Sequence, residues 1–85
     1  MKYRLVYTHR AIKDIRRFEP KVKKHIGKAL LRYEEDPLKY AVRLTESKLG
    51  TYRFRIGDYR AIFDLEDDEI VILRVDHRRD IYRKL

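Results

Sequence analysis

TYRFRIGDYRAIFD, residues 51–64, is the segment of this chain that decides its fold. Apolar and polar residues alternate on both sides of Gly57-Asp58, a dipeptide typical of a two-residue hairpin turn, whose central residues need positive φ. The sequence therefore predicts a β-hairpin that pairs Arg55 with Arg60 and Phe54 with Ala61. One face of it is apolar and should pack on the core: Tyr52, Phe54, Ile56, Tyr59, Ala61 and Phe63.

The other face of this hairpin carries three arginines, Arg53, Arg55 and Arg60. Arg55 and Arg60 are directly opposed, and such a like-charged pair destabilises a hairpin by up to about 1 kcal/mol. The two side chains must either spread into water or hold an anion. A single exposed arginine is more often simply solvated, but three on one face favour an anion-binding surface.

Composition limits the classes of protein to which this chain can belong. Its 85 residues suffice for one domain, residues 1–85, and its net charge of +8 attracts polyanions. A surface that serves only solubility or ion-pair networks is the alternative. Cysteine is absent, which excludes disulfides, thiolate metal sites and a cysteine nucleophile. Without a signal peptide or a membrane-spanning run, we expect a cytoplasmic protein.

The first half of the chain predicts one strand and two helices. Lys2 to Tyr7 alternates like a strand, and Thr8 is placed to cap a helix that should end near Glu19, because Pro20 follows. Pro20 suits the first turn of a second helix, which Asp36-Pro37 should end. An apolar stripe on the second helix predicts a helical hairpin against one face of a sheet: Val22, Ile26, Ala29, Leu30 and Tyr33.

The second half predicts a three-strand meander. Leu38 to Gly50 is the least readable region: Tyr40, Val42 and Leu44 alternate, but the end resembles a loop. Beyond the hairpin, Asp67-Asp68 is a second turn before the continuous apolar run Glu69 to Val75, which is typical of a central strand. With that turn we expect three cross-strand pairs: Phe63 with Ile72, Ile62 with Leu73, and Arg60 with Val75.

The predicted fold is thus α+β: a small antiparallel-rich sheet, made of an N-terminal strand and the C-terminal meander, with a two-helix hairpin on one face. The expected register brings the C-terminal segment beside Arg60, on the face away from the helices. That face should then combine the three hairpin arginines and an apolar floor (Ile62, Val71, Leu73 and Val75) with His77, Arg78 and Tyr82.

Such a cluster suits a single-stranded RNA phosphodiester. Guanidinium groups bind phosphate bidentately, and a tyrosine can stack on a base or transfer a proton. The 2′-hydroxyl of RNA can itself attack the phosphate, so the protein needs no nucleophile, and we expect no metal or cofactor. For Tyr82 an ordinary packing role is the alternative, and for His77 a surface or helix-capping role.

Two motifs carry a family resemblance, Tyr52 to Arg60 and Val75 to Arg83. Together they resemble the RelE branch of the RelE/ParE toxin superfamily, and the likeness covers essentially the whole chain. The resemblance implies a RelE-like fold and a toxin that cuts mRNA in the ribosomal A site by 2′-hydroxyl attack. It also implies a RelB-like antitoxin, the ribosome and mRNA as partners, no membrane, and DNA contact only through the antitoxin complex.

The resemblance also assigns roles to residues. Arg60 would hold the scissile phosphate, Arg78 would be a further family arginine, and Tyr82 matches a tyrosine near the C-terminus of the family. Arg53 and Arg55 stand where relatives have lysines, and we expect them to bind the RNA backbone. Arginine does not serve as a base at working pH, so His77 is the titratable candidate for a general base.

Two other functions remain open. A ParE-like protein would poison DNA gyrase by protein contact. A binding module would be either a non-catalytic RNA-binding protein or a decayed toxin that only sequesters its antitoxin. The cationic hairpin and the terminal tyrosine favour RNA cleavage over gyrase inhibition.

Overall fold

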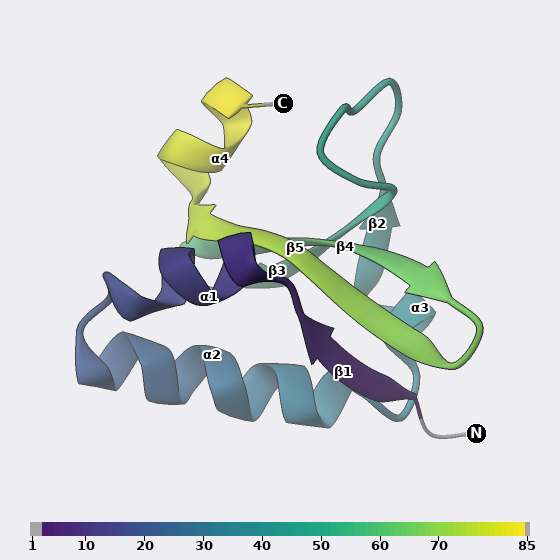
Figure 1. Ribbon diagram of the computed structural model, residues 1–85, viewed down its shortest axis with the longest axis horizontal. Coiled ribbons are helices and arrows are strands. Elements are labelled where there is room, and N and C mark those ends of the chain that lie inside the picture. Colours follow the sequence, from purple (N-terminus) through teal and green to yellow (C-terminus); the bar gives the residue numbers. More distant parts are fainter. Residues whose placement is uncertain (1–2, 85) are drawn as a thin grey trace.

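A five-stranded mixed sheet with helices on both sides is seen in the computed structural model, which describes residues 3–84 (Figure 1). The strand order is β1-β5-β4-β3-β2, with β1 parallel to β5 and all other neighbours antiparallel. The elements, in chain order, are β1 (Arg4–Tyr7), α1 (His9–Arg16), α2 (Pro20–Tyr33), α3 (Pro37–Tyr40), β2 (Ala41–Arg43), β3 (Tyr52–Ile56), β4 (Tyr59–Glu66), β5 (Glu69–His77) and α4 (Arg78–Lys84). The predicted α+β fold is confirmed.

The hairpin of β3 and β4 has the predicted register. Arg55 pairs with Arg60, Phe54 pairs with Ala61, and Gly57 in the turn has a φ of 59°. Glycine adopts this left-handed conformation without the steric cost that a Cβ brings. The apolar face of the hairpin packs on the core, as expected.

The two N-terminal helices also follow the sequence prediction. The Thr8 side chain caps α1 by accepting a hydrogen bond from the Ala11 backbone N–H at 3.2 Å. The helix ends at Arg16, three residues before the expected end near Glu19, because Phe18 turns its ring onto Tyr59, 5.0 Å away between centroids. Lys2, the first residue of the expected N-terminal strand, lies outside the described residues.

Stacked aromatic rings connect α2 to the hairpin. The ring of Tyr33 lies 4.7 Å from that of Phe54, which lies 4.1 Å from Phe63. Ile26 and Leu30 of α2 are buried in the same core. The apolar stripe predicted for α2 is therefore what covers the sheet.

The region from Leu38 to Gly50 contributes two elements that the sequence did not separate. Pro37 begins the short helix α3, which ends at Tyr40, and Val42 lies in β2, an edge strand paired antiparallel with β3. Three residues are too few for periodicity alone to distinguish a strand from a loop. The sheet thus gains a fifth strand.

A β-bulge between β4 and β5 changes the predicted register. Phe63 pairs with Ile72 as expected, but Ile62 pairs with Arg74 instead of Leu73, and Arg60 pairs with Asp76 instead of Val75. The extra residue in β5 reverses which side chains face the helices from that point on. Val75 consequently belongs to the core and not to the open face, and the two expected pairs were wrong.

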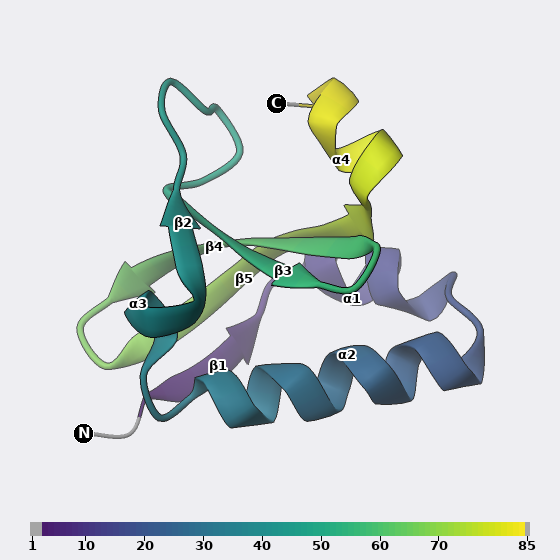
Figure 2. The ribbon, with the colours of Figure 1, turned by 180° about the vertical axis from the view of Figure 1, so that it is seen from behind.

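The face of the sheet away from α2 is partly covered. Both α4 and the loop between β2 and β3 project from this side (Figures 1 and 2). A Cβ placed on Gly50 of that loop would lie 2.7 Å from Leu73 Cδ1 and 2.8 Å from Ile62 Cγ2, so the loop backbone packs directly on these side chains. Ile62 is fully buried, and the expected exposed apolar floor is instead a second packing layer.

The two glycines Gly27 and Gly50 should respond oppositely to the same substitution. Nothing lies within 4 Å of a Cβ at Gly27 in α2, so Gly27→Ala should stabilise the protein by about 1 kcal/mol through helix propensity. Gly50→Ala overpacks the loop and should destabilise it by about 1–3 kcal/mol. Urea denaturation measures both, and two changes of the same sign would contradict the packing described for the loop.

Candidate nucleic-acid interface

The hydroxyl group of Tyr82 is the point where three elements meet. Arg53 of β3 donates a hydrogen bond to it from Nη1 at 2.7 Å, and Arg60 of β4 donates another from Nε at 3.3 Å. Both guanidinium groups also lie near the ring, 5.9 and 6.0 Å from its centroid. The predicted association of the hairpin arginines with Tyr82 is therefore present, on the face opposite α2. We call Arg53, Arg60 and Tyr82 the Tyr82 cluster.

Arg60 is a rigid part of this cluster. Its side chain is buried, and Nη1 donates to the backbone oxygens of Gly57 at 2.7 Å and Tyr59 at 2.8 Å. Among residues 3–84, no hydrogen-bond partner is found for its Nη2. The turn thus fixes the guanidinium and leaves one edge able to bind an anion.

The repulsion between the opposed Arg55 and Arg60 is relieved because one side chain is buried and the other is exposed. Arg60 leans onto the turn and Tyr82, whereas Arg55 is exposed and makes no side-chain hydrogen bond to the described part of the chain. The like-charged pair is therefore tolerated by spreading, and both charges still act on the same face.

The arginines lower the pKa of Tyr82. The hydrogen bond from Arg60 is the largest cause, partial burial opposes it, and the charges of Arg53, Arg60 and Arg55 add to the lowering. Two cationic donors on one phenol oxygen favour its ionised form. A tyrosine with a lowered pKa is better suited to accept a proton than an ordinary one.

His77 is not brought into the cluster. It pairs with Tyr59 across the sheet, and the two rings meet edge to face at 5.4 Å on the side that carries the core. Its Nδ1 accepts a hydrogen bond from the Arg79 backbone N–H at 3.2 Å, at the start of α4. Since alternate residues of a strand face opposite sides, His77 and the Arg60 side chain lie on different faces. His77 therefore lies at the same end of the sheet as Arg60, as expected, but on the opposite face and outside the Tyr82 cluster.

Arg78 lies beside the hairpin turn. Its backbone N–H donates to the Asp58 oxygen at 2.7 Å, which attaches the beginning of α4 to the turn. Its side chain is exposed and has no hydrogen bond or ion pair within residues 3–84. The backbone of Arg78 therefore lies near the Tyr82 cluster, and its cationic side chain is unpaired within residues 3–84.

Sequence reasoning missed how α4 is anchored. Asp76 at the end of β5 is buried and accepts a hydrogen bond from Lys84 Nζ at 2.7 Å, with Arg17 at 3.5 Å. Burial alone would raise the pKa of Asp76, but the hydrogen bonds from Lys84 and the His77 backbone, with the charges of Lys84 and Arg17, hold it below its usual value. The only sequence signal was an acidic residue directly after an apolar strand.

The cluster provides fixed positive charge and one group able to exchange a proton, on an exposed side of a sheet. In residues 3–84, no three His, Asp or Glu side chains converge in a way that could hold a metal ion. No helix in the same range is long and apolar enough to cross a membrane. The geometry suits stabilisation of a phosphate by the arginines and proton transfer by Tyr82.

Comparison with known proteins identifies the class. Residues 3–82 match the model of the ParE toxin of type II toxin–antitoxin systems. The toxin RelG of Mycobacterium tuberculosis is 33% identical over 87 residues, covering 99% of this chain and 100% of that protein. The chain therefore belongs to the ParE toxin family, within the RelE/ParE superfamily of type II toxin–antitoxin toxins.

Solved structures agree with this assignment. A chain of the RelBE2 toxin–antitoxin complex of M. tuberculosis superposes with a TM-score of 0.83 at 30% identity, over 92% of this chain and 100% of that one. The archaeal RelE–RelB complex of Pyrococcus horikoshii gives 0.71 at 26% identity, over 92% of this chain and 97% of that one. A mutant of Escherichia coli RelE in the free state gives 0.75 at 21% identity, covering 99% of this chain and 94% of that one, a likeness of fold.

Tyr82 should ionise at lower pH than a free tyrosine side chain, because the two arginines stabilise its phenolate and lower its pKa. Tyr7 should ionise at higher pH, because burial and the nearby Glu34 raise its pKa. An NMR titration of ¹³Cζ-labelled tyrosines measures both. Arg60→Gln should raise the Tyr82 midpoint most, Arg53→Gln less, and Lys24→Gln on α2 not at all. A midpoint that neither arginine substitution moves would contradict the hydrogen bonds described here.

Proposed function

We propose that this toxin is a ribosome-dependent endoribonuclease that cuts mRNA in the decoding A site. The observation that carries the proposal is the phenol oxygen of Tyr82, which accepts hydrogen bonds from both Arg53 and Arg60 on one exposed face. Fixed guanidinium groups beside a group with a lowered pKa fit a reaction in which RNA supplies its own nucleophile. Similarity to RelG and to RelE structures supports the same activity.

The proposed step is an in-line displacement at phosphorus. The 2′-oxygen bonds to phosphorus as the bond to the 5′-oxygen of the next nucleotide breaks, which leaves a cyclic phosphate and a 5′-hydroxyl. Tyr82 takes the proton of the attacking hydroxyl, and a proton is returned to the leaving oxygen. Arg60 and Arg78 stabilise the charge that grows on the phosphate, and Arg53 and Arg55 position the RNA backbone.

This assignment gives the proton transfer to Tyr82 and not to His77. The His77 ring lies on the core side of β5 and its Nδ1 is engaged at the start of α4. A general base must come within hydrogen-bond reach of the proton that it removes. His77 fits the role of a helix-capping residue better.

Partners follow from the same proposal. We infer that a RelB-like antitoxin neutralises the chain, because the relatives from M. tuberculosis and P. horikoshii were solved as complexes with antitoxins. The ribosome and mRNA are the targets, which implies action in the cytoplasm by one toxin domain, residues 1–85. Contact with DNA would be indirect, through the antitoxin complex.

Inhibition of DNA gyrase is the second candidate function, since the matching family model is that of the ParE toxin. It requires no RNA chemistry and no role for the phenol of Tyr82. Inhibition of supercoiling by the purified protein, without any cleavage of mRNA, would favour it.

Addition of the protein to a reconstituted translation reaction should produce cuts inside the A-site codon. Primer extension maps the new 5′ ends, and a reaction without ribosomes is the control. Cuts that disappear without ribosomes are expected. Cuts on naked RNA would contradict the ribosome dependence, and no cuts by folded protein would contradict the nuclease activity.

Tyr82→Phe should slow cleavage by roughly 10²–10⁴-fold, because it removes the proton-transfer group and leaves the ring. Arg60→Gln should slow cleavage by roughly 10²–10³-fold through lost charge stabilisation. Single-turnover rates on ribosomes measure both, with Lys24→Gln as the control and circular dichroism to check folding. His77→Gln should retain cleavage, and a loss as large as that of Tyr82→Phe would return the role of base to His77.

A further inference from the structure

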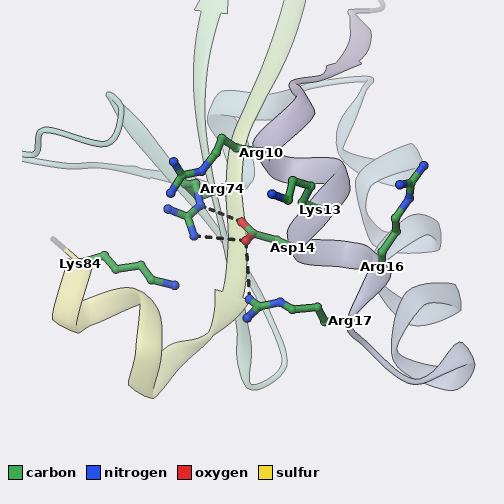
Figure 3. A pocket seen from close by; sticks show the side chains of 7 residues that line it. All are labelled: Arg10, Lys13, Asp14, Arg16, Arg17, Arg74 and Lys84. Carbon is green, nitrogen blue, oxygen red and sulfur yellow. Dashed lines mark hydrogen bonds and ion pairs between the residues drawn. The ribbon is translucent and has the colours of Figure 1, made fainter.

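A second basic site lies on the other side of α4 from the Tyr82 cluster. It is a groove of about 590 Å³ between α1, β5 and the end of α4 (Figure 3). Its lining has six basic side chains and one acidic one: Arg10, Lys13, Asp14, Arg16, Arg17, Arg74 and Lys84. We call it the α1–α4 groove. None of these residues belongs to the Tyr82 cluster.

The carboxylates at this site are fully engaged within the protein. Asp14 accepts hydrogen bonds from Arg74 Nε at 2.8 Å, from Arg74 Nη2 at 3.1 Å and from the Val75 backbone N–H at 3.0 Å. Asp76, behind the groove, holds Lys84 and Arg17. These two carboxylates face six cations, so the groove keeps an excess of positive charge.

Three of the six cations, Arg10, Lys13 and Arg16, have no partner in the described part of the chain. Arg10 and Lys13 are exposed on α1 and make no hydrogen bond or ion pair with residues 3–84. They stand three residues apart on one helix face, a spacing at which like charges destabilise a helix. Figure 3 shows them directed toward Asp14 and Arg74, whereas Arg16 points away. The fold thus brings these two positive charges together beside one carboxylate, Asp14, which Arg74 already engages.

The chemistry of the lining selects the kind of anion. Within residues 3–84, no aromatic or large aliphatic side chain lines the groove. Among these lining residues, a nucleobase therefore has no aromatic ring to stack on, and an amphipathic peptide has no pocket for an apolar anchor. Guanidinium and ammonium groups without apolar neighbours match phosphate oxygens, which are contacted without reading the bases.

We propose that the α1–α4 groove binds phosphate groups of a nucleic-acid backbone, as a contact separate from the Tyr82 cluster. Tyr82 and Lys84 are two residues apart in α4 and point to opposite sides of it, one toward Arg60 and the other toward Asp76. A strand that crosses α4 would therefore meet both sites. The groove holds no group placed to transfer a proton to RNA, so its role is binding, and it does not require that the chain cut RNA.

Fluorescence anisotropy with a labelled single-stranded 2′-O-methyl RNA tests the groove apart from cleavage, because this probe has no free 2′-hydroxyl. The double variant Arg10→Ala, Lys13→Ala should weaken binding about tenfold or more at low salt. It should also reduce the magnitude of the negative slope of log K (the association constant) against log[salt] by about 1.4, the value for two lost phosphate contacts on a single strand. The control, Lys24→Ala with Lys28→Ala on α2, removes the same charge and should change both quantities much less.

Three results would overturn the proposal. The groove variant could bind the RNA as tightly as the unmodified protein, or the two double variants could weaken binding equally, which would indicate the general field of the protein. The third result is that labelled poly-glutamate binds the groove variant more weakly than it binds the unmodified protein, while RNA binding is unchanged. The groove would then be a site for an acidic peptide.

Discussion

The stack of aromatic rings between α2 and the β3–β4 hairpin is the contact on which the rest of the structure depends. Tyr40 and Tyr33 lie 4.6 Å apart, Tyr33 meets Phe54 at 4.7 Å, and Phe63 lies between Phe54 and Tyr52, 5.4 Å from the latter. Offset aromatic pairs contribute about 0.5–1.5 kcal/mol each beyond the area that they bury. Because strand residues alternate in direction, fixing these rings against α2 turns Arg53 and Arg60 to the opposite face. The arginine-bearing face is thus a consequence of core packing.

Arg53 and Arg60, the two arginines that donate to the Tyr82 hydroxyl, are held to different degrees. Arg60 is held by the backbone oxygens of the turn, so its guanidinium is already ordered before any ligand arrives. Arg53 carries a buried Nε without a hydrogen-bond partner in the described residues, an arrangement that costs about 1–3 kcal/mol. One arginine is therefore fixed and the other is poorly satisfied, which suits a site where a phosphate replaces protein partners.

The buried carboxylates Asp14 and Asp76 give α4 its position. Asp76 binds Lys84 near the end of the helix, and Arg17 bridges Asp76 and Asp14 from the end of α1. A buried carboxylate that loses its cation is strongly destabilising, so these contacts constrain both helices. The same network orients the helix that carries Tyr82 and organises the base of the α1–α4 groove. The Tyr82 cluster and the α1–α4 groove consequently share their supports.

The sequence by itself determined the hairpin, its register and its arginine face, because a two-residue turn and alternation with period two leave one arrangement that buries Phe54 and Phe63. It also determined α2 and the association of Arg60 with Tyr82. Only the tertiary structure decided the bulge opposite Ile62, which no local pattern signals and which moved His77 to the core face and Asp76 to the other. The α1–α4 groove was equally hidden, since its charges come from segments far apart in the chain and meet only when α1 and α4 pack beside β5.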